Sequence, residues 1–346
     1  MTVQDHSTIT TSSSSSARRP QDHALIGQAA KIPAAAPEQT ISISPVILPA
    51  PNRIIDLHMR ITAPSTTANS PGPLPLILLS HGHGFSNHLS SLHGYGPLAD
   101  FWAARGFIVV QPTHLSSKSL SLDPSVAGAP LFWRSRVDDM KLILDHLALI
   151  EELAPMLKGR VDHTRIAVAG HSMGSHTAAM LLGMRLTDPA DGRVVDLFDP
   201  RIQAGVLLTP IGNGGEALSP AAAERYAFLR DSSFAEMRTP ALVAVGDADA
   251  SPHLTVRGPE WHADAYVHGP APKSLLTVAA ATHGLGGIAG YDARETTDES
   301  VERVGVVQRV TWAYLRARLC GDEEAWQEAV RVVGAELKGL ARVESK

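Results

Sequence analysis

The segment Gly170-His171-Ser172-Met173-Gly174 lies between a predicted buried strand over residues 165–169 and a predicted helix over residues 175–182. A turn this tight forces the serine into a strained backbone conformation. Glycines are needed beside it because the strand and the helix pass close together. The turn exposes the Ser172 hydroxyl at the carboxyl edge of a sheet, where the N–H groups of the following helix face a reacting oxygen. The pattern Gly-x-Ser-x-Gly in this setting predicts a nucleophilic serine.

Strands and helices alternate along the chain, which predicts an α/β fold with a mainly parallel sheet covered by helices on both faces. Residues 41–46 and 54–61 alternate in polarity and are expected to form an antiparallel hairpin at the sheet edge. Buried strands are expected over residues 74–79, 107–110, 166–169, 204–208, 241–245 and 274–278. Helices are expected over residues 99–105, over 134–150, from a capping box at Thr296 and Glu299 to Leu319, and from 323 to about 340.

The 346 residues, 44% of them hydrophobic and 19% charged, suit one large α/β domain with an additional tail. We expect residues 1–38, rich in Ser, Pro and Ala, to form a disordered tail and residues 39–346 to form a single domain with C-terminal helices. The N-terminal segment has no apolar stretch of a secretory signal, and no run approaches the ~18 apolar residues of a membrane span, so the expected location is the cytoplasm. The net charge of −5 and a pI of about 6.3 argue against a nucleic-acid partner. The single cysteine, Cys320, excludes an intrachain disulfide.

A serine hydroxyl is a weak nucleophile until a base removes its proton, and that base is usually a histidine oriented by a carboxylate. In sheets of this kind the acid and then the histidine follow the serine along the chain. The strand over residues 241–245 runs into an acidic turn, where Asp249 is the expected acid and Asp247 the alternative. The aspartate that is not the acid is expected to cap this turn through backbone N–H groups. Among sixteen histidines, His283 is the expected base because it follows the last predicted strand and precedes a glycine.

Negative charge on a reacting oxygen must be stabilised by N–H donors, and two backbone groups are expected to supply them. One is the N–H of Met173, directly after the serine, and the other is the N–H of His83 in the loop Ser80-His81-Gly82-His83-Gly84. The histidines at 81, 83, 88 and 93 raise the question of a metal. They lie in a Gly/Ser-rich segment with no acidic residue before Asp100, so no metal site is predicted.

Two loops, over residues 113–131 and 211–238, leave strand carboxyl ends and are expected to shape the substrate pocket. Phe85, Phe132 and Trp133 lie in or near such loops and are candidates for an apolar acyl or alcohol site. Packing of these aromatic side chains in the core is the equal alternative.

These motifs resemble those of the α/β-hydrolase serine esterases, in the group that spans dienelactone-hydrolase-like proteins, platelet-activating-factor acetylhydrolases, chlorophyllases and polyester-hydrolysing cutinases. The resemblance covers roughly residues 41–320. The matching segments are the loop from Ser80 to Gly84, the turn from Gly170 to Gly174, the turn from Gly246 to Asp249, and Thr282-His283-Gly284. Two features depart from the group: dienelactone hydrolases proper use a cysteine nucleophile, and the helices after Glu299 extend beyond its smallest members.

The resemblance implies an α/β-hydrolase fold and hydrolysis of a carboxylic ester through an acyl-enzyme on Ser172, without a cofactor. The implied partner is a small-to-medium, apolar, small-molecule ester. Three alternatives use the same three residues: an acyltransferase, a peptidase and a perhydrolase. The alternative from another class is a catalytically inactive binding protein of the same fold.

Overall fold

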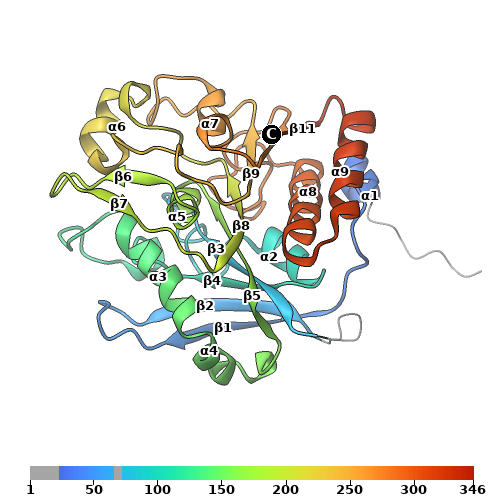
Figure 1. Ribbon diagram of the computed structural model, residues 1–346, viewed down its shortest axis with the longest axis horizontal. Helices are drawn as coiled ribbons and strands as arrows, with labels where there is room; N and C mark the ends of the chain where they lie inside the picture. The colour runs from blue at the N-terminus through green and yellow to red at the C-terminus, as the bar shows by residue number, and fades with distance from the viewer. Residues whose placement is uncertain (1–22, 66–71) are drawn as a thin grey trace, which may run out of the picture.

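The central feature of the computed structural model, which describes residues 23–65 and 72–346, is a sheet with the strand order β1-β2-β4-β3-β5-β8-β9-β10-β11 (Figure 1). The strands from β4 to β10 in this order run parallel to their neighbours. Strands β1 and β2 at one edge and β11 at the other edge pair antiparallel. The chain is therefore an α/β protein with a large, mainly parallel central sheet, and the predicted N-terminal hairpin is confirmed.

The strands of this sheet are β1 (Thr40–Leu48), β2 (Leu57–Pro64), β3 (Leu74–Ser80), β4 (Ile108–Pro112), β5 (Val161–His171), β8 (Ile202–Leu208), β9 (Ala241–Gly246), β10 (Lys273–Val278) and β11 (Ala341–Ser345). A separate ribbon pairs β6 (Arg185–Thr187) with β7 (Val194–Asp196). The α-helices are α1 (His23–Ile26), α2 (Gly96–Ala103), α3 (Trp133–Asp145), α4 (Leu147–Leu153), α5 (Met173–Leu181), α6 (Pro220–Arg225), α7 (Asp264–His268), α8 (Val301–Cys320) and α9 (Glu323–Glu336). Short 3-10 helices are η1 (Gly27–Lys31), η2 (Lys118–Leu120), η3 (Pro155–Leu157), η4 (Gly215–Ala217), η5 (Ala227–Leu229) and η6 (Pro259–Ala263).

Each face of the sheet carries its own apolar core, because successive side chains of a strand point to opposite faces. In β3, Leu76 and Leu78 join the core beneath α3, α4 and α5, while Ile77 and Leu79 join the core beneath α2, α8 and α9. Figure 1 shows these two groups of helices on opposite sides of the sheet. The continuous apolar runs of the sequence thus become strands that are buried on both faces.

One predicted helix, over residues 134–150, is in fact two helices, α3 and α4, that meet at His146. The imidazole Nδ1 of His146 donates to the carbonyl of Leu142 at 2.9 Å, which is the acceptor that a continuing helix would offer to the His146 N–H. That N–H bonds instead to the carbonyl of Ile143, and the helix ends there. A side chain that competes for a backbone acceptor explains the break.

The C-terminal predictions need two corrections. The helix α8 begins at Val301, and its N-cap is Ser300, whose side chain accepts from the Arg303 N–H. The predicted cap, Thr296, instead donates its hydroxyl to the Gly290 carbonyl. The last helix ends at Glu336, and residues 341–345 form the edge strand β11 along β10. This strand covers the edge of β10, whose backbone groups would otherwise be unpaired. Such pairing is a tertiary contact, so the local helix pattern could not predict it.

The predicted N-terminal tail is wrong over residues 23–38, while residues 1–22 lie outside the described residues. The helices α1 and η1 pack against α8, and the side chains of Ala29 and Ile32 are fully buried there. The guanidinium of Arg309 donates to the Ile32 carbonyl at 2.7 Å. Within the two described ranges, no helix has the length and apolar character needed to cross a membrane.

Candidate active site

The turn between β5 and α5 holds Ser172 in a conformation that serine rarely adopts, with φ 55° and ψ −119°. Such a positive φ is strained for a residue with a side chain and persists only where surrounding structure enforces it. A Cβ added at Gly170 would collide with the carbonyl of Gly174, and one added at Gly174 would collide with the carbonyl of Ser80. Both positions therefore require glycine, because β5, α5 and the end of β3 touch through their backbones.

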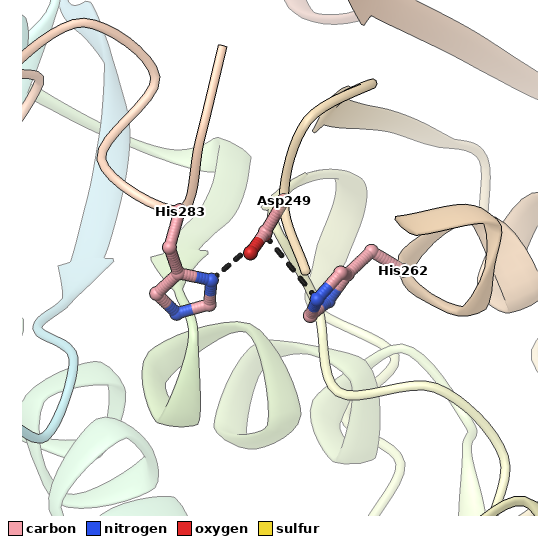
Figure 2. A group of neighbouring side chains, drawn as sticks. All are labelled: Asp249, His262 and His283. Carbon is pink, nitrogen blue, oxygen red and sulfur yellow. Dashed lines mark hydrogen bonds and ion pairs between the residues drawn. The ribbon is translucent and has the colours of Figure 1, made fainter. Parts of the chain in front are cut away.

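The side chains of His283 and Asp249 meet at the carboxyl edge of the sheet, after β10 and β9 (Figure 2). The Nδ1 of His283 lies 2.8 Å from Oδ2 of Asp249, whose side chain is almost completely buried. Burial alone would raise the pKa of Asp249, but the hydrogen bond and charge of His283 outweigh it and hold the pKa below its ordinary value. A carboxylate can only accept, so Nδ1 carries the proton and Nε2 is left as a base.

Asp247 does not reach His283. Its Oδ1 accepts a hydrogen bond of 2.6 Å from the N–H of Ala280, in the turn that leads to His283. The structure thus brings Asp249 to the histidine, whereas Asp247 caps the turn after β10 in place of the expected turn after β9.

A cavity of about 300 Å³ is lined by Ser172, His283, His83 and Met173 together. In the described part of the chain, neither the Ser172 hydroxyl nor Nε2 of His283 has a hydrogen-bond partner. The backbone N–H groups of His83 and Met173 are likewise unpaired among the described residues. Four groups with unsatisfied hydrogen-bonding capacity therefore surround one cavity.

The rest of this cavity is largely apolar, and much of it comes from the predicted pocket loops. Its apolar walls are formed by Phe85, Leu131, Met173, Ile211, Tyr226, Leu229 and Leu254. Two parts of the lining were not predicted from the sequence: His253 with Leu254, and Arg294, Glu295 and Thr297. The carboxylate of Glu295 accepts from the N–H and the hydroxyl of Ser86, at 2.8 and 2.6 Å, and so ties the loop after β3 to this wall.

Of the three aromatic candidates, Phe85 alone lines this cavity; it is exposed, and the Arg294 guanidinium lies 5.1 Å from its ring centroid. Phe132 lines a separate cavity of about 490 Å³, together with Leu115 and Ala127 of the 113–131 loop. Trp133 stacks on Phe228 with ring centroids 5.7 Å apart and packs against the core. The packing alternative therefore holds for Trp133, and Phe132 lies away from Ser172.

A second histidine, His262 of η6, contacts the Asp249 carboxylate and was not predicted (Figure 2). Its Nδ1 donates to the Pro210 carbonyl at 2.7 Å, and its Nε2 lies 3.2 Å from Oδ2 of Asp249. Burial lowers the pKa of His262, although the charge of Asp249 opposes this effect. Ser251 adds a hydroxyl donor to the other carboxylate oxygen at 3.3 Å. The carboxylate is therefore bonded by His283 and Ser251, and His262 can donate to it only in its charged form, which carries a proton on Nε2 as well.

A third histidine, His171 within the tight turn, connects the base to the loop after β3. Its Nε2 donates to the backbone carbonyl of His283 at 2.8 Å, so its Nδ1 must accept the hydroxyl of Tyr95 at 2.7 Å. The same Tyr95 oxygen accepts from the Gly82 N–H at 2.9 Å. Burial lowers the pKa of His171 to about 3, so its ring is neutral at neutral pH.

Two histidines of the segment after β3, His81 and His88, contact backbone groups of the protein. His81 bonds to the Gly82 carbonyl and to the His114 N–H, and His88 contacts the Ala289 carbonyl. Among the described residues, the group close enough to share an ion is instead Asp249, His262 and His283. Its closest pair, at 2.8 Å, is bridged by the Nδ1 proton of His283, and a metal could bind there only by displacing that proton.

The arrangement combines a strained serine hydroxyl, an imidazole base on a buried carboxylate and two unpaired N–H donors around one largely apolar cavity. Together these groups can deliver a nucleophile, transfer a proton and stabilise negative charge on oxygen. No protein-family model matches the chain, and a search among curated proteins finds no match.

Proposed function

We propose that this protein is a serine carboxylic ester hydrolase of the α/β-hydrolase fold, which acts through an acyl-enzyme. The observation that carries the proposal is that Ser172, at its strained turn, shares a cavity with His283, whose Nδ1 is 2.8 Å from the buried Asp249. The mainly parallel sheet with an antiparallel N-terminal edge supports the fold assignment.

In the proposed reaction, Oγ of Ser172 attacks the ester carbonyl carbon while Nε2 of His283 takes the hydroxyl proton. The tetrahedral species then expels the alcohol, which receives that proton from His283. A water molecule, deprotonated by the same Nε2, attacks the acyl-enzyme, and the acid leaves as Ser172 regains its proton. Asp249 fixes the orientation of the imidazole and stabilises its charged form in both halves of the reaction.

The developing oxyanion is stabilised by the N–H groups of His83 and Met173. Both line the cavity beside Ser172 and have no competing acceptor in the described part of the chain. Met173 is also the first residue of α5, so the positive end of that helix faces the same oxygen. Fixed donors of this kind contribute without reorganising during the reaction.

The cavity favours a small-to-medium ester with an apolar acyl or alcohol group, because its walls are mainly aliphatic and aromatic and its volume is about 300 Å³. An inactive binding protein would have no use for the conformation of Ser172, which destabilises the fold by ~1–3 kcal/mol. An acyltransferase would use the same groups, with an alcohol in place of water as the acceptor.

The test combines covalent labelling with turnover. A fluorophosphonate probe should label Ser172 in the native protein, and p-nitrophenyl butyrate should be hydrolysed; the Ser172→Ala variant should do neither. A native protein that takes no label at Ser172 would refute the serine-hydrolase proposal. Product analysis with added alcohol separates the two acyl-transfer alternatives, since a transferase would release ester in preference to acid.

A further inference from the structure

A guanidinium lies completely buried against the segments that carry His83 and Met173, two residues that line the cavity of Ser172. Arg136 of α3 has no exposed surface and ranks among the largest fully buried side chains of the described residues. Burying a charged group is unfavourable unless its hydrogen bonds are replaced. The positions of those hydrogen bonds therefore indicate what the residue is for.

The hydrogen bonds of Arg136 run to three separate segments around the site. Nη2 donates to the His81 carbonyl and, at 3.2 Å, to the Ser80 hydroxyl, both at the end of β3. Nη1 donates to the hydroxyl of Ser116 at 2.5 Å, in the loop after β4. Nε donates to the hydroxyl of Thr177 at 3.0 Å, in α5.

Two of these contacts lead to the proposed oxyanion donors. The Thr177 hydroxyl donates a hydrogen bond of 3.1 Å to the Met173 carbonyl, one turn back in α5. On the other side, the His81 carbonyl that Arg136 holds lies two residues before His83 in the same loop. One rigid planar group thus spans the gap between the segments that carry the two N–H donors.

The positive charge of Arg136 is not neutralised by a neighbouring acid. Among the described residues, no carboxylate lies within ion-pair distance of its guanidinium; the nearby Asp139 pairs with Arg53 and His114. A chain of hydrogen bonds connects the two groups: Arg136 donates to the Ser80 hydroxyl, Ser80 donates to Nε2 of His114, and Nδ1 of His114 donates to Asp139. Two neutral groups therefore separate the guanidinium from its counter-charge.

The field of this charge reaches both sides of the site. The pKa of His83 is lowered to about 4, mainly by burial and secondly by the positive charge of Arg136. Arg136 is likewise the second cause, after burial, that lowers the pKa of His176 in α5 to about 3. A positive potential that disfavours charged imidazoles at these positions favours negative charge on an oxygen in the same region.

We propose that Arg136 is a positioning residue of this site: its guanidinium fixes the spacing of the His83 and Met173 N–H donors and places a positive charge behind them. This inference rests on the proposed ester hydrolysis and goes beyond it, because Arg136 lines no part of the cavity.

The experiment first measures fluorophosphonate labelling and p-nitrophenyl butyrate hydrolysis by the wild-type protein. An inactive, unlabelled wild type refutes the proposed function itself, and the inference fails with it. With an active wild type, the Arg136→Met and Arg136→Lys variants are compared at a temperature where thermal unfolding shows each to be folded. Arg53→Met is the matched control, because Arg53 is also a buried arginine, with 7% of its side chain exposed, but lies on the far side of Asp139.

Arg136→Met should lower kcat by about 100-fold with KM within about threefold of wild type, as expected for support of a transition-state interaction. The inhibition constant of a boronic acid that mimics the tetrahedral species should rise by the same factor as kcat/KM falls. Arg136→Lys should lose about tenfold, because it keeps the charge without the planar fork. Arg53→Met should lower the melting temperature and leave kcat within about threefold of wild type.

Thr177→Val removes one branch of the network without changing side-chain volume and should lower kcat by about tenfold. This variant and Arg136→Lys decide the question should Arg136→Met fail to fold. Wild-type kcat in folded Arg136→Met, or in both Thr177→Val and Arg136→Lys, overturns the proposal. An equal loss of kcat in the Arg53→Met control also overturns it, because the effect would then belong to any buried arginine.

Discussion

The substitution Gly174→Ala tests how closely the tight turn must pack against the loop after β3. The added methyl group would meet the carbonyl carbon of Ser80 at 2.7 Å and the carbonyl oxygen of His81 at 2.8 Å, and would lie closer still to the Ser80 oxygen. Real Cβ atoms essentially never approach within 3.0 Å, and here the obstacles are backbone atoms that cannot rotate away. The helix α5 and the loop that carries His83 must therefore separate.

The required separation is about 1 Å, and a displacement of that size near reacting groups lowers the rate by ~100-fold. In free energy this corresponds to about 2.7 kcal/mol of lost transition-state stabilisation. The strain of overpacking should also lower the free energy of unfolding by ~1–3 kcal/mol. We therefore expect Gly174→Ala to be folded but severely impaired.

The measurements are kcat/KM for p-nitrophenyl butyrate, the rate of fluorophosphonate labelling, and urea unfolding followed by circular dichroism. The matched control is Gly334→Ala in the helix α9, where a Cβ meets no atom within 4 Å. That variant should keep full activity and gain about 0.5–1 kcal/mol, because alanine is the better helix former. Wild-type labelling and stability in Gly174→Ala would refute the reasoning, since the turn would then tolerate a side chain that the packing excludes.

Two further predictions concern the acid and the buried histidines. Asp249→Asn should lower kcat by about 10⁴-fold, because it removes the carboxylate that orients His283. Asp247→Asn alters only the cap on Ala280, so it should lower the melting temperature while kcat stays within about tenfold of wild type. Equal losses of kcat in the two variants would contradict the assignment of Asp249 as the acid. The pKa values of His83, His171 and His176 in the folded protein, about 4, 3 and 3, lie below the ordinary value of 6.5. The stability tied to their neutral forms is therefore complete above pH 6.5 and is lost as the pH falls to about 4 for His83 and to about 3 for His171 and His176. Near pH 5 these three groups should lower the free energy of unfolding by about 4 kcal/mol for each pH unit of acidification. His176→Leu should remove about a third of that slope, measured by urea unfolding at several pH values. An unchanged slope would argue against a neutral His176 in the folded protein.

The residues that follow strands could be predicted because parallel strands bring their carboxyl ends to one edge of the sheet. Ser172 follows β5, Asp249 follows β9 and His283 follows β10, so their order along the chain already implies their proximity. The choice between Asp249 and Asp247 could not be made in the same way. It depends on which carboxylate the turn aims at His283, and that is a property of a few backbone angles.

The partners of these residues could not be predicted, because each is recruited by tertiary contact. His262 follows Asp249 at no spacing that a motif records, and it reaches the carboxylate only because η6 lies against the end of β9. Arg136 is the sharper case. A charged residue beside the apolar Val137 and Met140 is normally expected at the helix surface, yet Arg136 is completely buried. It is buried because Ser80, His81, Ser116 and Thr177 together supply its acceptors, and no local pattern shows that such acceptors will converge.

The glycine-rich loop after β3 poses a physical problem, since a segment with this much conformational freedom makes a poor preorganised donor. The structure answers it with two buried networks that bond the two ends of one peptide group of the loop, the one between His81 and Gly82. The guanidinium of Arg136 holds the His81 carbonyl, and the hydroxyl of Tyr95, itself bound to His171, holds the Gly82 N–H. The next N–H, that of His83, is left unpaired among the described residues and lines the cavity. Because His171 belongs to the same turn as Ser172, and Arg136 is bonded to α5 through Thr177, we expect a shift of Ser172 to move this loop with it.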